Sequence, residues 1–358
     1  MENISRIKEK CVGCKSCEQS CPKHCISMVE NKEGFWYPSV DEKSCIECKV
    51  CLKKCPVENT EFHRNEPHKV WAWRNKNDVD IMRSASGGAA DSAAKTILQM
   101  GGVVYGAAYD EQLAVSHIEV TDEAEREKLQ SSKYVQSDPK DSYTKVKQRL
   151  SEGKTVLFTG TPCQIAGLYA FLGGNPENLY TVDLICHGTP SPAILRQFLS
   201  ENGIDMNQLE SIEFRSKGSF QLRENERTID LPGVLDGYTV AFLAGLGYTE
   251  NCYHCRYASI ERVSDVTLGD SWGTNLTEEM RRGVSLVLVQ NQKGQRLIDL
   301  AGAELMTVDI ETAIKNNGQL RSPSEKPSAR ARFFEDLSCG RSITDAVRRS
   351  LPKRYFKQ

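Results

Sequence analysis

The sequence has no run that approaches the ~20 consecutive apolar residues of a membrane-spanning helix. Its first residues, MENISRIKEKC, lack the apolar stretch of a secretory signal. Charge of one sign is not in excess either, since 46 basic residues face 48 acidic ones and the net charge is −2. Broad nucleic-acid binding needs a basic footprint. We therefore expect a cytoplasmic protein with no membrane span and no nucleic-acid partner.

Several catalytic signatures are also missing. No G-x-G-x-x-G follows a strand-like segment and no Walker loop occurs, which disfavours a simple Rossmann dehydrogenase and a P-loop enzyme. No Ser/His/Asp arrangement or carboxylate pair is recognisable, so hydrolytic chemistry is unsupported. With 358 residues, 39% of them hydrophobic and 26% charged, the chain has an ordinary globular composition. That length suits two or three domains at about 150 residues each.

Cysteine, by contrast, is concentrated in one region. Fourteen cysteines occur in the chain, and nine of them fall within the first 55 residues. In a cytoplasmic chain, clustered cysteines indicate metal binding rather than disulfides.

The clustered cysteines form two runs of C-x2-C-x2-C-x3-C, each followed by proline. This is the spacing of bacterial two-cluster ferredoxins, in which the fourth cysteine of each run ligates the other cluster. We expect one 4Fe–4S cluster on Cys11, Cys14, Cys17 and Cys55, and a second on Cys45, Cys48, Cys51 and Cys21. Structural zinc sites are the alternative, although zinc usually takes two separated pairs of ligands. The ninth cysteine, Cys25, is either a small buried hydrophobe or a residue with a ligand-swap or redox role.

Strand-like and helix-like segments alternate after residue 70. Strands are expected at 70–75, 103–110, 117–122, 155–160 and 179–188, and helices at 161–172 and 191–200. This alternation predicts an α/β core with a mixed sheet, and α+β architecture overall once the ferredoxin-type domain is added. Ser84 or Ser86 is expected to cap a helix that runs to about Met100. A serine–glycine helix start of this kind is either a plain cap or a phosphate cradle.

Four further cysteines belong to this core: Cys163, Cys186, Cys252 and Cys255. Cys163 and Cys186 each follow a strand, so both are expected at the carboxyl edge of a parallel sheet. Cys252 and Cys255 form a CxxC pair. The spacing leaves open a third 4Fe–4S cluster, a zinc site and a redox dithiol. Cys339 stands alone and is expected to be structural.

The motifs follow one another in a recognisable order. After the tandem cysteine runs come SASGGAA, GGVVYGAAYD, TGTPCQIAGL, VDLICHG, CYHCRYA and SDVTLGDSWG. In this order the sequence resembles the coenzyme F420 hydrogenase/dehydrogenase beta-subunit family, over roughly Cys11 to Gln290. The resemblance implies an FAD and one or more 4Fe–4S clusters, with electrons passing between the clusters, the flavin and a second, organic redox partner.

The resemblance also implies site residues. It favours a third cluster at the four core cysteines, and FAD contacts at Ser86, Gly87, Gly88, Gly102, Tyr105, Gly106, Lys133 and Tyr134. Lys133 would face a flavin carbonyl or a phosphate and Tyr134 would pack beside the ring, whereas surface and edge packing is the ordinary role of such a pair. Asp265 and Asp270 either order the junction between cluster and flavin or are turn residues.

The sequence thus predicts an iron–sulfur flavoprotein oxidoreductase, with catalytic residues unassigned. The partner would be a redox small molecule such as coenzyme F420, a redox protein such as ferredoxin, or both. The alternatives are a non-catalytic electron-relay subunit of a larger complex and a ferredoxin-fed flavin reductase of a sugar, pigment or sulfur compound. The expected domains are a two-cluster domain at 1–60, a linker at 61–69, an FAD and iron–sulfur core at 70–338 and a basic tail at 339–358. The loop FRSKGSF at 214–220 is a candidate substrate-side segment.

Overall fold

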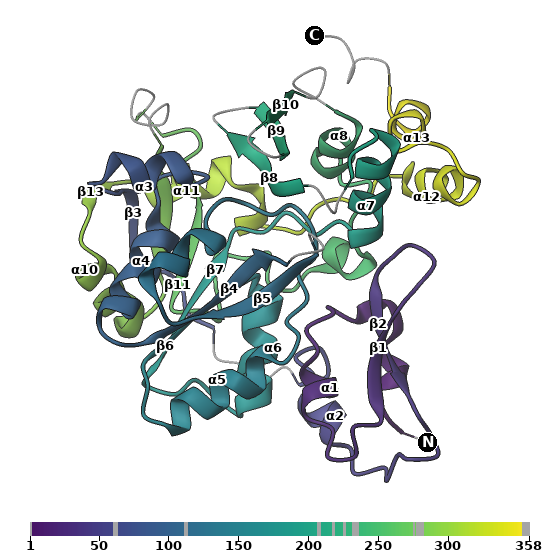
Figure 1. Cartoon of the computed structure of the whole chain (residues 1–358). Coiled ribbons are helices and arrows are strands. Elements are labelled where there is room, and N and C mark those ends of the chain that lie inside the picture. The colour runs from purple at the N-terminus through teal and green to yellow at the C-terminus, as the bar shows by residue number, and fades with distance from the viewer. Residues whose placement is uncertain are drawn as a thin grey trace.

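The computed structural model describes residues 2–59, 64–110, 114–205, 209–216, 219–224, 227–230, 236–274, 276 and 283–352. Figure 1 shows a small N-terminal domain, in purple, beside a larger core built on one central sheet. No described helix is long and apolar enough to cross a membrane. Parts of the candidate loop at 214–220, including residues 217 and 218, lie outside the described residues.

The N-terminal domain consists of two short helices, one hairpin and a 3-10 segment. In chain order these are η1 (Ile4–Lys10), α1 (Ser16–Gln19), β1 (Ile26–Glu30), β2 (Trp36–Val40) and α2 (Val50–Lys53). The strands β1 and β2 pair antiparallel. Both α1 and α2 start after a lysine in the left-handed conformation, Lys15 and Lys49, each with a φ of 58°. The two cysteine runs therefore share one local geometry.

The core is built on an eight-stranded mixed sheet. Its strands are β3 (Lys69–Arg74), β4 (Val103–Tyr109), β5 (Val115–Val120), β6 (Val156–Thr159), β7 (Leu179–Leu184), β11 (Val266–Asp270), β12 (Ser285–Val289) and β13 (Glu304–Thr307). They lie in the order β13-β3-β12-β11-β7-β6-β4-β5. The strands β4, β6, β7 and β11 run parallel, while β5 and β12 pair antiparallel with their neighbours. The predicted α/β core with a mixed sheet is confirmed.

Helices cover both faces of this sheet because successive strand residues point to opposite sides. The helices α4 (Ala89–Gln99) and α10 (Gln292–Ala301) pack on one face, over Leu157, Val182 and Val287. The helices α5 (Ser142–Ser151) and α6 (Pro162–Leu172) cover the other face, over Val156 and Phe158, and α11 (Ile310–Asn316) extends that layer. Shorter elements join them: α3 (Asp78–Arg83), η2 (Glu123–Leu129), η3 (Glu250–His254) and η4 (Gly318–Leu320).

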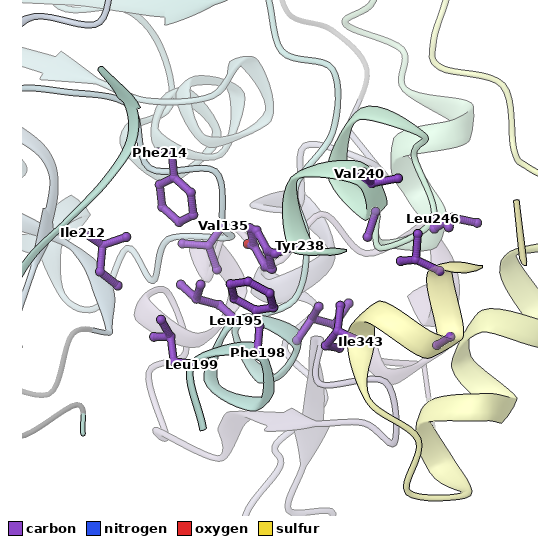
Figure 2. Close-up of a cluster of buried hydrophobic side chains, with 14 of the residues drawn as sticks. Val135, Leu195, Phe198, Leu199, Ile212, Phe214, Tyr238, Val240, Leu246 and Ile343 are labelled. Carbon is purple, nitrogen blue, oxygen red and sulfur yellow. The ribbon is translucent and has the colours of Figure 1, made fainter. Parts of the chain in front are cut away.

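A second cluster of buried side chains lies beside the sheet. Around it are α7 (Pro192–Glu201), α8 (Gly237–Leu243), α12 (Arg330–Ser338), α13 (Ile343–Ser350) and a small antiparallel sheet of β8 (Leu209–Ser216), β9 (Ser219–Glu224) and β10 (Arg227–Asp230). Figure 2 shows Phe198, Tyr238 and Phe214 packed together, with Ile343 of α13 beside them. The segment from 339, expected as a tail, thus contains a helix that contributes to this core.

The start of α4 differs from the sequence prediction. Its N-cap is Gly88, in the left-handed conformation, and no side chain caps the helix. Ser84 instead donates to the backbone carbonyl of Asp80, and the Ser86 hydroxyl lies 2.8 Å from that of Ser285 on β12. The expected serine cap is therefore wrong, because contacts with α3 and a distant strand take both hydroxyls.

Candidate iron–sulfur centres

The cysteines of the two N-terminal runs line two separate pockets. One pocket contains Cys11, Cys14, Cys17 and Cys55, and the other contains Cys21, Cys25, Cys45, Cys48 and Cys51. The fourth cysteine of each run has crossed to the other group, as the two-cluster spacing requires. We call these groups centre I, with Cys14, and centre II, with Cys45. Their assignment as cluster ligands stays a prediction.

The thiols of centre I are strongly perturbed. Burial raises the pKa of Cys11 to about 12 and raises that of Cys14 well above its usual value. The nearby Cys55 disfavours both thiolates further. Metal ligands must be deprotonated. The pocket therefore suits a group whose positive charge compensates several thiolates at once.

The spread of the thiols bears on the zinc alternative. Among the residues that the structure describes, no three Cys, His, Asp or Glu side chains are placed to hold a single metal ion. A zinc site needs four donors within about 2.3 Å of one ion. The thiols instead line the walls of the two pockets.

Cys25 lies in centre II as a fifth thiol. Its Sγ is 3.4 Å from the Sγ of Cys21, and it packs in the buried cluster of the N-terminal domain. Both sequence interpretations of Cys25 remain compatible with this position, since it is buried and also adjacent to a predicted ligand.

The four core cysteines come together from three segments. Because β6 and β7 are parallel neighbours, Cys163 after β6 and Cys186 after β7 lie at one edge of the sheet, which we call the carboxyl edge. This shared edge is the one the sequence predicted. Cys252 lies in η3 and Cys255 ends it. Burial raises the pKa of Cys163 and Cys186 to about 12 each, and the neighbouring Cys255 raises both further.

The start of α6 fixes the position of Cys163. Pro162 occupies the first turn, and the Gln164 side chain accepts a 2.9 Å hydrogen bond from the backbone N–H of Thr161. Proline and a capping box are both typical of a helix start. Cys163 thus lies in the first turn of α6, where the helix dipole favours a thiolate.

Helix α6 also contacts the N-terminal domain. A Cβ added at Gly167 would lie 2.7 Å from the Cβ and 2.9 Å from the Sγ of Cys14. Gly167 is four residues after Cys163, which is about 6 Å along a helix. The charges of both Cys14 and Cys163 raise the pKa of Tyr143 and of Tyr257, so these two buried rings lie near both thiols. Centre I and the core cysteines are therefore close neighbours.

A row of aromatic rings leads away from the core cysteines. A Cβ added at Gly188 would lie 2.3 Å from the ring of Tyr248, which places that ring beside the segment of Cys186. The Tyr248 ring centroid is 5.7 Å from that of Phe242, which in turn stacks on Tyr134 at 4.5 Å. The row thus reaches Tyr134, one of the residues implied for FAD.

Lys133 and Tyr109 lie at the same end of the row. The Nζ of Lys133 is 5.8 Å from the ring centroid of Tyr109, the last residue of β4, and donates to the carbonyl of Gln130 at 2.7 Å. Burial lowers the pKa of Lys133 to about 7. The Tyr109 hydroxyl is buried with no hydrogen-bond partner in the part of the chain that the structure describes. A buried hydroxyl without a partner beside a half-buried amine needs an explanation, and a polar ligand is one.

Ser86, Gly87 and Gly88 lie at the same edge of the sheet. Strand β3 runs parallel to β11, since both pair antiparallel with β12, and the N–H of Asn75 just after β3 bonds to the carbonyl of Gly87 at 2.9 Å. A Cβ at Gly87 would lie 2.2 Å from a backbone oxygen of β3, so this glycine is required by strand contact. In the first turn of α4, Asp91 accepts from Gln130 at 2.8 Å, which links this turn to the Lys133 loop.

The other three residues implied for FAD lie elsewhere. Gly102 precedes β4, at the far end of α4, and a Cβ there would lie 2.6 Å from the carbonyl of Thr155. Tyr105 is fully buried and stacks on Phe158 beneath α5 and α6. Gly106 packs against Leu129 and Thr159. The structure therefore does not bring these three to the edge where Ser86 and Lys133 lie.

Comparison with known proteins agrees with the order of the motifs. Residues 153–313 match the family model for the C-terminal part of the coenzyme F420 hydrogenase/dehydrogenase beta chain. Over that segment the chain is similar to the beta-subunit family. Residues 10–59 match the 4Fe–4S dicluster domain, which supports iron–sulfur clusters in the N-terminal domain. Together the two matches support a redox role.

One similar solved structure is a xenon derivatization of the F420-reducing NiFe hydrogenase complex from Methanosarcina barkeri. One of its chains is similar to this chain, with 18% sequence identity and a TM-score of 0.46. The similarity covers 76% of this chain and 95% of that one. No curated protein matches the chain in sequence.

The sequence did not indicate that Gly167 and Tyr248, both within residues 153–313, contribute to the site. Gly167 and Tyr248 matter through contacts with Cys14 and Cys186, and no local pattern signals such pairings. Asp265 differs from expectation in another way. It precedes β11 at the edge away from the cysteines, where its carboxylate accepts from the N–H of Thr181 at 2.8 Å. Asp265 therefore joins two strands and does not lie at the junction that the resemblance implied.

Proposed function

We propose that this chain is an iron–sulfur flavoprotein oxidoreductase that passes electrons between two ferredoxin-type clusters, a core 4Fe–4S cluster and FAD, and exchanges them with an organic redox partner such as coenzyme F420. The observation that carries the proposal is the contact of Cys14 with Gly167, one helical turn from Cys163. It puts two thiol groups from separate domains next to each other, as electron transfer requires.

The order of the centres follows from this contact. Centre I lies against α6, and centre II shares the N-terminal domain with it. Cys17 of centre I is close enough to Cys51 of centre II for the charge of Cys51 to raise its pKa. Electron tunnelling weakens steeply with distance, so the favoured route runs from centre II through centre I to the core cysteines.

The flavin would lie at the carboxyl edge, between Ser86 and Lys133. FAD, when bound, couples one-electron transfer with a cluster to two-electron exchange with an organic partner. Lys133 supplies a half-buried amine whose lowered pKa lets it hold or release a proton at Nζ near neutral pH. The rings of Tyr134, Phe242 and Tyr248 form a continuous row of contacts between Lys133 and the segment of Cys186.

Cofactor content tests the proposal first. The full chain is purified without oxygen, and iron, sulfide and flavin are measured per chain. About twelve irons and one FAD are expected, since three cubes carry four irons each. Reduced coenzyme F420 should then reduce the bound flavin in stopped-flow absorbance. Eight irons without flavin would overturn the core cluster and the flavin role, leaving a ferredoxin domain on an inactive core.

One observation favours the relay-subunit alternative. Leu184, the last residue of β7, and Trp272, two residues after the neighbouring β11, are 46% and 45% exposed at the carboxyl edge. Exposed apolar side chains at a redox edge suit contact with another protein. A relay subunit should leave coenzyme F420 unreacted on its own and turn it over only with a partner protein, whereas a self-sufficient enzyme needs none.

A further inference from the structure

Arg262 is a buried cation, and two of its hydrogen-bond donors have no acceptor among the described residues. It lies between the CxxC loop and β11, and the residue is 1% exposed. Its Nε and Nη2 have no hydrogen-bond partner in the part of the chain that the structure describes. Buried donors without acceptors are unfavourable, because water no longer solvates them. The guanidinium of Arg262 is therefore stabilised by a nearby negative charge.

The backbone holds Arg262 in place. Its N–H donates to the carbonyl of Asn65 at 3.0 Å, and the N–H of Asn65 donates back at 2.9 Å. The next residue, Val263, packs in one buried cluster with Cys163 and Cys255. The backbone at Arg262 is therefore fixed beside the core cysteines, and the side chain starts from a defined position.

Arg262 adjoins the core cysteines, since the next residue, Val263, packs in one buried cluster with Cys163 and Cys255. The guanidinium charge lowers the pKa of both Cys186 and Cys255, opposing the effect of burial. It also lowers the pKa of Asp183, a fully buried carboxyl on β7 whose pKa burial raises to about 6. The hydroxyls of Ser264 and Thr267 also lower the pKa of Asp183, and among the described residues no hydrogen bond joins its carboxylate to Arg262.

Charge balance identifies what would compensate Arg262. Four thiolates outweigh the positive charge of an iron–sulfur core, so the liganded cluster is anionic and becomes more so when it accepts an electron. Net charge, burial and hydrogen bonds to sulfur set the potential of such a cluster. A buried cation nearby stabilises the reduced form more than the oxidised one.

We propose that Arg262 is the counter-charge of the core cluster and raises its reduction potential. The inference rests on the proposed function, because it requires a 4Fe–4S cluster on the four core cysteines. It adds a specific consequence, namely that the core cluster accepts one electron from centre I more readily because of Arg262. Asp183 acts in the opposite sense, since its negative charge disfavours reduction.

The test is a potentiometric titration of the anaerobic full-length holoprotein at pH 8, followed by electron paramagnetic resonance. One electron enters each cluster from mediators, and the two N-terminal clusters serve as internal references. The Arg262→Gln variant should lower the reduction potential of the core cluster. At a fixed applied potential, the ratio of reduced to oxidised core cluster should be about tenfold smaller than in the wild type, which corresponds to a shift of ~59 mV for one electron. Arg262→Lys should keep most of the wild-type value. Asp183→Asn should shift the potential upward.

Arg64 provides a matched control. Its charge also acts on Cys255, but its side chain reaches solvent and donates to the carbonyl of Arg256. Because water screens exposed charges, Arg64→Gln should shift the core potential far less than Arg262→Gln.

The outcomes separate the inference from the function beneath it. Twelve irons with an unchanged core potential in Arg262→Gln would overturn the role of Arg262 and leave the proposed function standing. Eight irons in the wild-type chain would overturn both. If Arg262→Gln fails to retain its core cluster, the other two variants decide: a preserved potential in Arg262→Lys and an upward shift in Asp183→Asn support the inference, and any other pair of results overturns it.

Discussion

The contact between Gly167 and Cys14 can be tested by adding one methyl group. In Gly167→Ala the new Cβ would lie 2.7 Å from the Cβ and 2.9 Å from the Sγ of Cys14, and 3.0 Å from the hydroxyl of Tyr143. Carbon atoms in folded proteins do not approach this closely. Because Gly167 lies inside α6, the loop that carries Cys14 has to move outward.

The magnitude follows from two opposing effects. Overpacking a tight contact costs about 1–3 kcal/mol. Replacing glycine by alanine within a helix contributes about 0.8–1.0 kcal/mol in the other direction. The net expectation is a loss of about 0–2 kcal/mol in the free energy of unfolding, together with a longer path between centre I and the core cysteines.

Two assays read these effects separately. Urea unfolding of the anaerobic holoprotein, followed by cluster absorbance, gives stability, and stopped-flow reduction by dithionite gives the rate at which electrons reach the core. Gly318→Ala is the matched control, since no described atom lies within 4 Å of a Cβ there. Gly167→Ala should slow the transfer, and Gly318→Ala should leave it unchanged. A Gly167→Ala protein about 1 kcal/mol more stable than wild type, with unchanged transfer, would refute the close contact.

Three further predictions concern Cys25, Arg126 and Lys133, and the first two are each compared with a second variant. Cys25→Ala should keep the wild-type iron content if Cys25 only fills space, whereas Cys51→Ala should lose iron, as measured by chemical iron assay. Arg126→Met should lower the free energy of unfolding in urea by about 3–5 kcal/mol, because it removes the cation that pairs with the buried carboxylates of Asp80 and Asp91. Arg83→Met removes an exposed ion pair with Glu127 and should lower it by less than about 1 kcal/mol. The lowered pKa of Lys133 means that the unfolded chain binds more protons above pH 7. Wild type should therefore gain stability relative to Lys133→Met as the pH rises from 7 to about 9.

Each of these predictions has a contrary result. Iron loss in Cys25→Ala equal to that in Cys51→Ala would make Cys25 a ligand. Equal costs for the two arginine variants would mean that the Arg126 pairs are hydrated. A stability difference between wild type and Lys133→Met that does not change with pH would place the amine of Lys133 in water in both states.

Much of the fold and of the cysteine grouping could be predicted because their causes are local. The spacing within each cysteine run is set by the shape of a cluster corner, and it predicted the partition in which Cys55 joins Cys11 and Cys21 joins Cys45. Buried strands such as Val156–Thr159 are continuous apolar runs, which parallel strands covered on both faces require. Neither inference needed a contact between distant segments.

The sequence predictions that the structure does not bear out failed because contacts between distant segments decide them. Ser86 has the right character for a helix cap, but its hydroxyl meets Ser285, which is 199 residues away in the sequence. The junction role that the resemblance implied for Asp265 is likewise not seen, because its carboxylate accepts hydrogen bonds from Thr181 on a neighbouring strand. In each case a long-range partner outcompetes the local role, and no pattern within the segment carries that information.

Helix α6 explains how two domains can hold their centres at a constant spacing. Cys163 and Gly167 lie four residues apart, so they occupy the same face of one rigid helix. Centre I touches this face at Gly167, and the core cysteines include its first turn. A movement of α6 relative to the sheet carries both contacts with it, whereas a movement of the N-terminal domain alone must break the contact of Cys14 with Gly167. Other contacts, such as that of Lys15 with Asp138 and that of Lys54 with the carbonyl of Phe171, also hold the domain on the core. The contact at Gly167 is the one next to Cys14, so a larger side chain there has to lengthen the path.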